Sequence, residues 1–470
     1  MSPSEGSGAL AGPPPRHWRA GDLALVIAAY LLFIGTALAI LMYAGGWSVG
    51  VFGALAAGVF VVLDPVRATS VAFLFMPQFF ELLPDFFHTL WYVGFGLLMV
   101  AWLKELALAR RHAVAPAHYL VLYTAFVGAL LLSVRTGVDW RDYHAEWFAP
   151  EVMWLALTPL LASLTPLALV AAIPGRRQLR TVAYGVVAGG LLHTPIVFVF
   201  TARGPVVQDL ERYYGLFGGP HTAGIFEALY LLCALALLWT EPALARRRVL
   251  LGCAVMFLGA LVVSGSRTTL LTLLLAGGLS ALFHLPQVLR KMSAIHIYLA
   301  GSLFVIGLVV ANSVYTITPG GGVGGVYGMT LNDRLALIRY GLELLRESPL
   351  TGVGIGRHVM VLQSWPLPGV HKINLIHTYY VTILVETGFL GFVPFMAIVG
   401  VATSHFLTSL ARFRAKNDFE MYCLTGAFFL AFVIVLAILA TQAATGERLF
   451  WALVGTALAA RRISLLGEPR

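Results

Sequence analysis

The sequence predicts an all-α fold, a polytopic membrane bundle of about 12–14 transmembrane helices. Of the 470 residues, 59% are hydrophobic and only 11% are charged, whereas about a quarter of the residues in a soluble domain are charged. The apolar residues form long unbroken runs, and a transmembrane β-barrel would instead show short segments of alternating hydrophobicity. Helices fit these runs because lipid cannot hydrogen-bond an open backbone.

The apolar runs place the expected spans in order along the chain. Residues 1–20 are polar and rich in Gly, Pro and Ser, and we expect a disordered cytoplasmic N-terminus there. A transmembrane bundle over 21–312 follows, with spans at 22–43, 47–63, 68–83, 88–103, 116–134, 151–173, 181–202, 222–240, 249–264, 268–285 and 294–312. C-terminal transmembrane helices fill 375–463, at 375–409, 419–440 and 447–460, before a cytoplasmic tail at 464–470. Because 375–409 is too long for one straight span, we expect it to begin outside the bilayer or to be tilted or broken.

The positive charges predict the orientation of this bundle. Twenty of the 31 Lys and Arg residues fall on the side of the N-terminus, most of them in clusters of two and three beside span ends, and the other 11 are isolated. Cytoplasmic loops carry such an excess of Lys and Arg, so both termini are expected in the cytoplasm. The net charge of +9 then reflects basic loops that face an anionic leaflet, and we expect membrane lipids rather than nucleic acid as partners.

One long segment outside the spans, residues 313–374, is expected on the outer side. Within it the pattern predicts an amphipathic helix over 330–347, because Thr330 and Asp333 have the spacing of a helix-capping pair. Apolar residues then recur at helical spacing, at Leu331, Leu335, Ile338, Leu342 and Leu345. This helix is expected to lie along the outer membrane surface or to pack over the bundle.

Residues that could carry chemistry gather on the outer side. Arg267 ends a Ser-Gly-Ser-Arg turn, Arg334 lies on the loop helix and His377 stands at the mouth of a span. Arginine is always charged and binds phosphate through two parallel hydrogen bonds, and histidine can accept a proton near neutral pH. A single interfacial Arg is more often a snorkelling anchor, but the order of the three residues indicates a site for an anionic lipid headgroup with a proton transfer.

A glycine-rich segment, Pro349–Arg357, lies between Arg334 and His377. Its glycines at 352, 354 and 356 predict a tight turn or a close approach of two backbones. A nucleotide-binding role is disfavoured because the segment does not open a helix after a strand. Glu386 lies deeper in the span that follows, and an intramembrane carboxylate is a candidate functional residue.

These motifs, in this order, resemble the O-antigen ligase and polysaccharide polymerase family of bacterial inner membranes. The similarity is strongest over residues 332–391, in Asp333-Arg334, in the glycine-rich segment, in His377–Tyr380 and in Glu386–Gly391. The Ser264–Arg267 turn matches an earlier motif of the family, and Gly218–Gly224 is a weaker match just before a span.

The resemblance implies a metal-independent glycosyltransferase of the GT-C fold type, without a cofactor, in the inner membrane. The donor would be a glycan on undecaprenyl diphosphate and the acceptor lipid A core or a growing polysaccharide, with the active site at the periplasmic face. The resemblance makes Arg267 and Arg334 the diphosphate-binding residues, and His377 the catalytic residue that activates or orients the attacking hydroxyl. Supporting residues are expected at Arg212, His221, Arg339, Gly354, Gly356, Tyr380 and Glu386.

The sequence departs from the family at two of these positions. The family usually has His-Asn or His-Ser where this chain has His377-Thr378, and Pro-Asn where it has Pro220-His221. His221 is therefore either a polar contact or, the favoured alternative, a substitute helix cap. Glu386 either pairs with a cation across the bundle or faces a small polar cavity, and a purely structural pair is equally compatible with the sequence.

No metal site is expected from the sequence. The outer loops contain no Asp-x-Asp pair, only Asp139-x-x-Asp142. The three cysteines, Cys233, Cys253 and Cys423, fall in apolar runs, which disfavours both a disulfide framework and a zinc site. Arginine would then take the role that a metal plays in other glycosyltransferases.

Two other classes of function compete with glycan transfer. A transporter or flippase of lipid-linked sugars would usually show internal repeats and broken helices around a midplane site, and the sequence shows neither clearly. A scaffold or receptor leaves the order of Arg267, Arg334 and His377 unexplained. Ligase and polymerase share donor chemistry and differ in the acceptor, so the sequence leaves both open.

Overall fold

The computed structural model describes residues 102, 115–137, 149–202, 220–264, 266, 269–274, 277, 331–357, 376, 378–440 and 447–466. All of them belong to the compact unit Ala57–Arg470. The spans expected before residue 115, the span at 294–312 and most of the span at 268–285 lie outside the described residues.

Every regular element of the described part is a helix, and that part contains no strand. The helices are α5 (Ala117–Gly137), α6 (Ala149–Ala172), α7 (Arg176–Ala202), α8 (Pro220–Thr240), α9 (Leu244–Val263), α12 (Leu331–Glu347), α14 (Tyr379–Ala415), α15 (Phe419–Leu439) and α16 (Glu447–Leu465). Among the described residues, three helices are long and apolar enough to cross a membrane, namely α8 over Thr222–Thr240, α14 and α15. The predicted fold class, a helical membrane protein, is confirmed.

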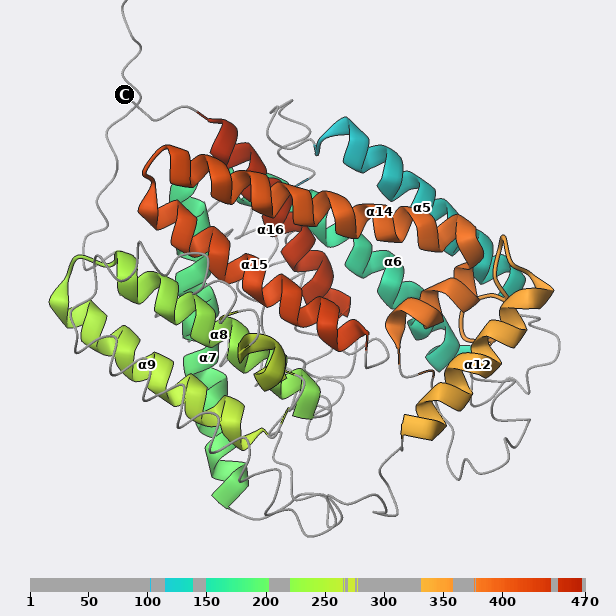
Figure 1. The fold of residues 1–470 in the computed structure, drawn as a ribbon, viewed down its shortest axis with the longest axis horizontal. Helices are drawn as coiled ribbons and strands as arrows, with labels where there is room; N and C mark the ends of the chain where they lie inside the picture. The colour runs from blue at the N-terminus through green and yellow to red at the C-terminus, as the bar shows by residue number, and fades with distance from the viewer. Residues whose placement is uncertain are drawn as a thin grey trace, which may run out of the picture. The chain divides into compact units, whose positions relative to one another are not determined.

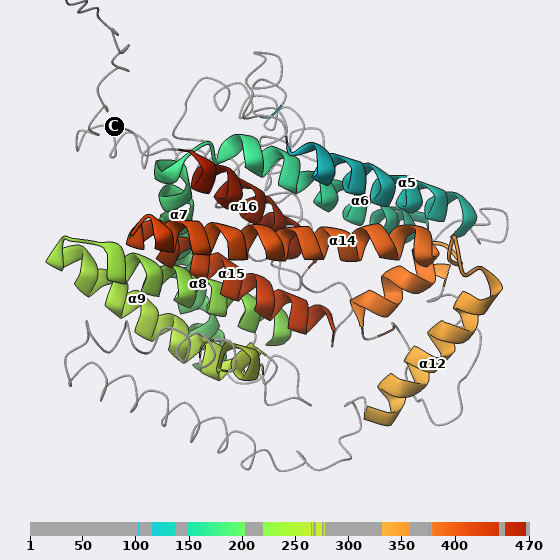
Figure 2. The same cartoon turned by 45° about the horizontal axis from the view of Figure 1, so that its top comes forward.

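The helices pack side by side around α14 and α15. Figure 1 and Figure 2 show α14 between α5 and α15, with α8 and α9 beyond α15 and with α12 near the beginning of α14. Helix α16 packs against α6, α14 and α15. The two sequence regions expected to carry the site, around α8–α9 and around α12–α14, therefore lie on different sides of α15.

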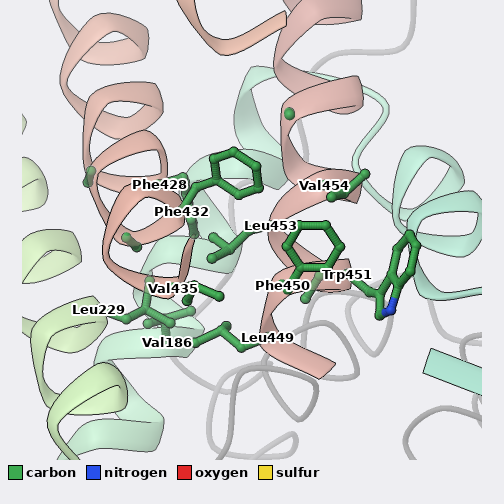
Figure 3. Close-up of a cluster of buried hydrophobic side chains, with 14 of the residues drawn as sticks. Val186, Leu229, Phe428, Phe432, Val435, Leu449, Phe450, Trp451, Leu453 and Val454 are labelled. Atoms are coloured by element: carbon green, nitrogen blue, oxygen red, sulfur yellow. The ribbon is translucent and has the colours of Figure 1, made fainter. Parts of the chain in front are cut away.

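The core is apolar and dense where α15 and α16 meet α7 and α8. Figure 3 shows Phe428 and Phe432 of α15 on the same side of α16 as Phe450, whereas Trp451 points away from α15. The rings of Phe432 and Phe450 are stacked with centroids 5.9 Å apart. Because α15 and α16 bury rings of this size on the sides that meet, the bundle behind the site is closely packed.

One end of the bundle is tied by ion pairs between helix ends. Arg176 of α7 lies 2.6 Å from Asp418, whose side chain also accepts the Met421 N–H and so caps α15. Arg180 of α7 pairs at 3.0 Å with Glu241, which directly follows α8. These residues lie at the ends that the positive-inside rule assigns to the cytoplasm.

Helix α14 is broken near its beginning. Its 37 residues would extend over about 55 Å if straight, well beyond a hydrocarbon core of about 30 Å. Gly388 has φ 61° and ψ −166°, which interrupts the helix, and Figure 2 shows the first part of α14 turned toward α12. The expectation that the long segment is tilted, broken or extends from the bilayer is thus met by a break at Gly388.

Candidate functional site

The glycine loop, residues 348–357, pairs with α14 where that helix is broken. A break leaves backbone N–H and C=O groups without helical partners, and such groups must be satisfied inside a membrane protein. The loop provides the partners through four hydrogen bonds, Val353 N–H to Val385 O (2.9 Å), Gly354 N–H to Glu386 O (3.1 Å), Phe389 N–H to Pro349 O (2.9 Å) and Leu390 N–H to Leu350 O (3.0 Å). The loop and the break therefore form one structural unit.

Two glycines allow this crossing. Gly352 has φ +73°, and a Cβ on it would lie 2.4 Å from the carbonyl carbon and oxygen of Glu386. Gly388 has φ +61°, and a Cβ on it would lie 2.3 Å from the carbonyl oxygen of Leu350. The close backbone approach predicted for the glycine-rich segment is confirmed at Gly352. The expected supporting residues Gly354 and Gly356 lie in the same loop and are buried.

Glu386 holds the C-terminal end of the glycine loop in place. Its carboxylate Oε1 accepts the N–H of Gly356 at 2.8 Å, and its carbonyl oxygen accepts the hydroxyl of Ser133 from α5 at 2.7 Å. Among the described residues, the carboxylate thus binds a backbone N–H, which neither of the two alternatives for its side chain included. This contact makes Glu386 a link between α5, α14 and the glycine loop.

Helix α12 packs against the first part of α14 with a face that differs from the predicted one, since Leu335 and Leu342 are exposed. Leu337, Tyr340 and Leu344 are buried in a cluster with Val353, Ile376 and Val385. A Cβ on Gly341 would lie 2.8 Å from Ile376 Cδ1, so the helix touches the residue that precedes His377. Of the two placements expected for the amphipathic helix, the structure shows packing over the bundle.

Burial and nearby acidic side chains both disfavour ionisation of a tyrosine on α12. Burial, reinforced by the negative charges of Glu347 and Glu343, raises the pKa of Tyr340. The hydroxyl adds no charge beside the glycine loop at neutral pH, since even an unperturbed tyrosine has a pKa of about 10.

The structure places some predicted residues and leaves others outside the described part. His377, Arg267 and Arg212 are outside it. Arg334 lies in the first turn of α12, seven residues before Gly341. Thr378 is the N-cap residue of α14 and is extended, with φ −155°. Ile376 packs against Gly341 of α12 and Thr378 begins α14, so the chain on either side of His377 is held by these two helices.

Two other predicted residues on these helices have different surroundings. Arg339 is exposed on α12, away from the buried cluster. Tyr380 donates its hydroxyl to the carbonyl oxygen of Leu436 at 3.1 Å, so it ties the start of α14 to α15.

A second cluster joins the Ser264–Arg267 turn to the start of α8. Ser264 follows α9, and its hydroxyl donates to the carbonyl of Leu261 at 2.7 Å. The hydroxyls of Ser266 and Thr269 lie 2.7 Å apart. A Cβ on Gly224 would lie 2.5 Å from Ser266 Cβ, so the turn rests directly on α8. The weaker motif Gly218–Gly224 and the Ser-Arg turn are thus brought together, with His221 in the first turn of α8.

Within the described part of the chain, no three His, Cys, Asp or Glu side chains gather closely enough to hold a metal ion. The hydroxyl hydrogen bonds of Ser264, Ser266 and Thr269 lie on either side of Arg267 in the sequence.

Sequence reasoning missed one buried polar group. Glu227 of α8 is fully buried and contacts His193 and Thr194 of α7. The rule that singled out Glu386, a carboxylate inside an apolar run, applies equally to Glu227 and could have found it.

Comparison with known families identifies the part of the chain that holds the Ser-Arg turn, α12 and the glycine loop. Residues 251–396 match the family model described as O-antigen ligase, the Wzy_C domain. The match covers less than half of the chain, from α9 through the Ser-Arg turn, α12 and the glycine loop to just beyond the break in α14. The resemblance stated from the motifs is confirmed over this range. No curated protein matched the chain.

Proposed function

We propose that this protein is a membrane glycosyltransferase that moves a glycan from undecaprenyl diphosphate to an acceptor sugar hydroxyl at the periplasmic face. Transfer of the O-antigen ligase type is supported by the match over 251–396. The single observation that carries the proposal is that this range contains the Ser-Arg turn, the helix with Arg334 and the two residues that flank His377. The acceptor is lipid A core for a ligase and a second carrier-linked glycan for a polymerase.

The proposed reaction uses three side chains and no metal. His377 accepts the proton of the acceptor hydroxyl, whose oxygen forms a new bond to the anomeric carbon of the donor. The bond between that carbon and the phosphate oxygen breaks, and the electron pair leaves with the diphosphate. Arg267 and Arg334 bind the diphosphate and stabilise the charge that develops on it.

The packing of the glycine loop supports this assignment. A proton acceptor must be held within hydrogen-bond reach of the hydroxyl that it serves, and small displacements at a reacting centre reduce rates strongly. Ile376, beside His377, is buried against Gly341 of α12, and α12 also carries Arg334. The loop and Glu386 hold α12 and α14 together, so they would fix the distance between Arg334 and His377.

The break in α14 is relevant to the competing transporter hypothesis. Broken helices are typical of secondary transporters, where the freed backbone groups bind substrate or ions. Helix α14 is broken, but the groups freed at Gly388 are bound by the glycine loop. The break therefore lacks the feature that would favour transport.

The proposal is tested by supplying the purified protein with an undecaprenyl-diphosphate glycan and candidate acceptors. His377→Ala and Arg334→Ala should each lower transfer by at least about 100-fold, the scale of a lost proton-transfer or charge-stabilising group. Arg334→Lys should also lose much of the activity, because lysine lacks the planar fork that binds phosphate. Arg346→Ala, at an exposed position of the same helix, is the matched control and should keep wild-type activity. Full transfer by both alanine variants would overturn the site assignment.

A further inference from the structure

A buried polar cluster lies between α7 and α8, outside the site described above. Glu227 of α8 is fully buried. The hydroxyl of Thr194 donates to its two carboxylate oxygens at 3.0 and 2.9 Å, and His193 Nδ1 lies 3.2 Å from Oε1. Because His193 and Thr194 belong to α7, one carboxylate ties the two helices together.

Association of these helices does not need a carboxylate. Gly190 of α7 lets aromatic rings approach so closely that a Cβ there would lie 2.7 Å from Tyr230 and 2.8 Å from Phe257. Replacing buried ionic groups by well-packed apolar residues is often neutral or stabilising, and the better-attested role of such groups is to fix register. Hydrogen bonds require defined directions, so this cluster sets how far α8 is shifted along α7.

The same part of α8 supports the Ser264–Arg267 turn. Gly224 lies three residues before Glu227, about 4.5 Å along the helix axis, and residues three apart are neighbours on a helix surface. The turn rests on Gly224 through Ser266, with no room for a Cβ between them. A shift of α8 along α7 would therefore move the support under the turn, and Arg267 directly follows Ser266 in the chain.

We propose that Glu227 is a positioning residue for the turn that carries Arg267. By holding α8 in register against α7, it sets the depth at which this turn rests on Gly224. The inference rests on the proposed function, since it takes Arg267 to bind the donor diphosphate. Loss of Glu227 should then weaken the use of the lipid-linked donor and leave the use of the acceptor unchanged.

The test measures the KM for donor and the KM for acceptor separately, with purified variants and an undecaprenyl-diphosphate glycan. Glu227→Leu should raise the donor KM at least about tenfold, because displacements of about 1 Å in an active site have effects of that size or larger. Glu227→Gln should stay within about threefold of wild type, because its amide can still accept from Thr194 and can donate to His193. A Glu227→Gln variant as defective as Glu227→Leu would overturn a purely positioning role.

A matched control comes from the other end of the same helix pair. Glu241 also joins α7 and α8, through Arg180 and Tyr184, but lies far from the turn. Glu241→Gln should lower the unfolding temperature without changing the donor KM. If Glu227→Leu and Glu241→Gln lowered stability to the same extent and neither variant changed the donor KM, the role of Glu227 would be only structural.

Two further variants keep the test decisive if Glu227→Leu does not fold. Thr194→Val removes the hydroxyl that donates to the carboxylate, and Gly224→Ala places a Cβ against Ser266. Both should raise the donor KM, and an unchanged donor KM in both would overturn the inference. Absence of transfer by the wild-type protein would instead refute the proposed function, so the two failures are distinguishable.

Discussion

Gly352 and Gly388 meet where the glycine loop crosses α14, and each has a positive φ. A Cβ on Gly352 would lie 2.6 Å from the N atom of Gly388, and a Cβ on Gly388 would lie 2.5 Å from the N atom of Gly352. Neither N atom can move aside by a side-chain rotation, because both belong to the backbone. Glycine is therefore required twice, once for conformation and once for space.

Alanine at either position should destabilise the protein. Gly352→Ala and Gly388→Ala should each cost about 2–4 kcal/mol, from the left-handed backbone and from the clash together. Gly400, on the helical part of α14, has nothing within 4 Å of an added Cβ, so Gly400→Ala should be neutral or stabilising by up to about 1 kcal/mol. Thermal unfolding of the purified variants in one detergent compares the three. Equal midpoints for all of them would show that the crossing is not as close as described.

For individual residues, the sequence predicted the positions that need glycine but not the contacts of the buried carboxylates. The spacing of glycines at 352, 354 and 356 predicted a close backbone approach, because only glycine permits one. The partner of Glu386 was not predictable, since Gly356 N–H reaches it only after the loop has folded back on α14. Glu227 was recognisable as an intramembrane carboxylate, but its contacts with His193 and Thr194 depend on how α7 packs against α8.

Among the elements, the helices were more predictable than their connections. The spacing of apolar residues predicted a helix over 330–347, and α12 covers Leu331–Glu347. Excess length predicted irregularity in 375–409, but its position at Gly388 is set by pairing with a loop that precedes it by more than 30 residues in the sequence. Local periodicity determines a helix, whereas such a pairing depends on tertiary contacts.

The ion pair between Arg180 of α7 and Glu241 at the end of α8 should make the stability of the fold depend on pH in the acid range. Burial raises the pKa of the Glu241 carboxyl, but the hydrogen bonds from Tyr184 and the Ala243 N–H and the charges of Arg180 and Arg246 outweigh burial, so the pKa lies below its ordinary value. A carboxyl whose pKa is lower in the folded state adds stability above its unfolded pKa of about 4.3, and this stability is lost as the pH falls through the folded pKa.

Glu241→Gln should accordingly lower the unfolding temperature by a few degrees at pH 7, and the difference from wild type should shrink as the pH falls below about 4. Glu420→Gln is the control, because Glu420 is a more exposed partner of Arg180 and exposed ion pairs contribute little to stability. Thermal unfolding in detergent at a series of pH values measures both variants. A difference that grew toward acid pH would contradict the assigned sign.

For the whole molecule, hydropathy and charge predicted the helical bundle because the bilayer itself selects long apolar segments. Every expected span that falls within the described residues corresponds to a helix. The way these helices bring distant motifs together was not readable. Gly224 and Ser266 meet because α8 and α9 pack antiparallel, and no local pattern encodes that contact.

The proposed orientation can be tested with single cysteines at exposed positions. Arg346→Cys on α12 should react with a membrane-impermeant maleimide in intact spheroplasts, because this helix is proposed to be periplasmic. Arg247→Cys, near the start of α9, should react only after lysis, because its cluster of arginines is proposed to be cytoplasmic. Both positions are exposed, so a reversed pattern would refute the orientation and not merely reflect burial.

The central claim is that the chain breaks the bond between a glycan and its lipid diphosphate and forms a new glycosidic bond. The most direct measurement is product analysis by mass spectrometry after the purified protein, in EDTA, is given an undecaprenyl-diphosphate glycan and an acceptor. The account predicts one released undecaprenyl diphosphate for each glycan joined to the acceptor, and at least about 100-fold less of both products with His377→Ala. An intact donor that has only crossed the membrane of a proteoliposome, or transfer that requires added metal, would contradict it.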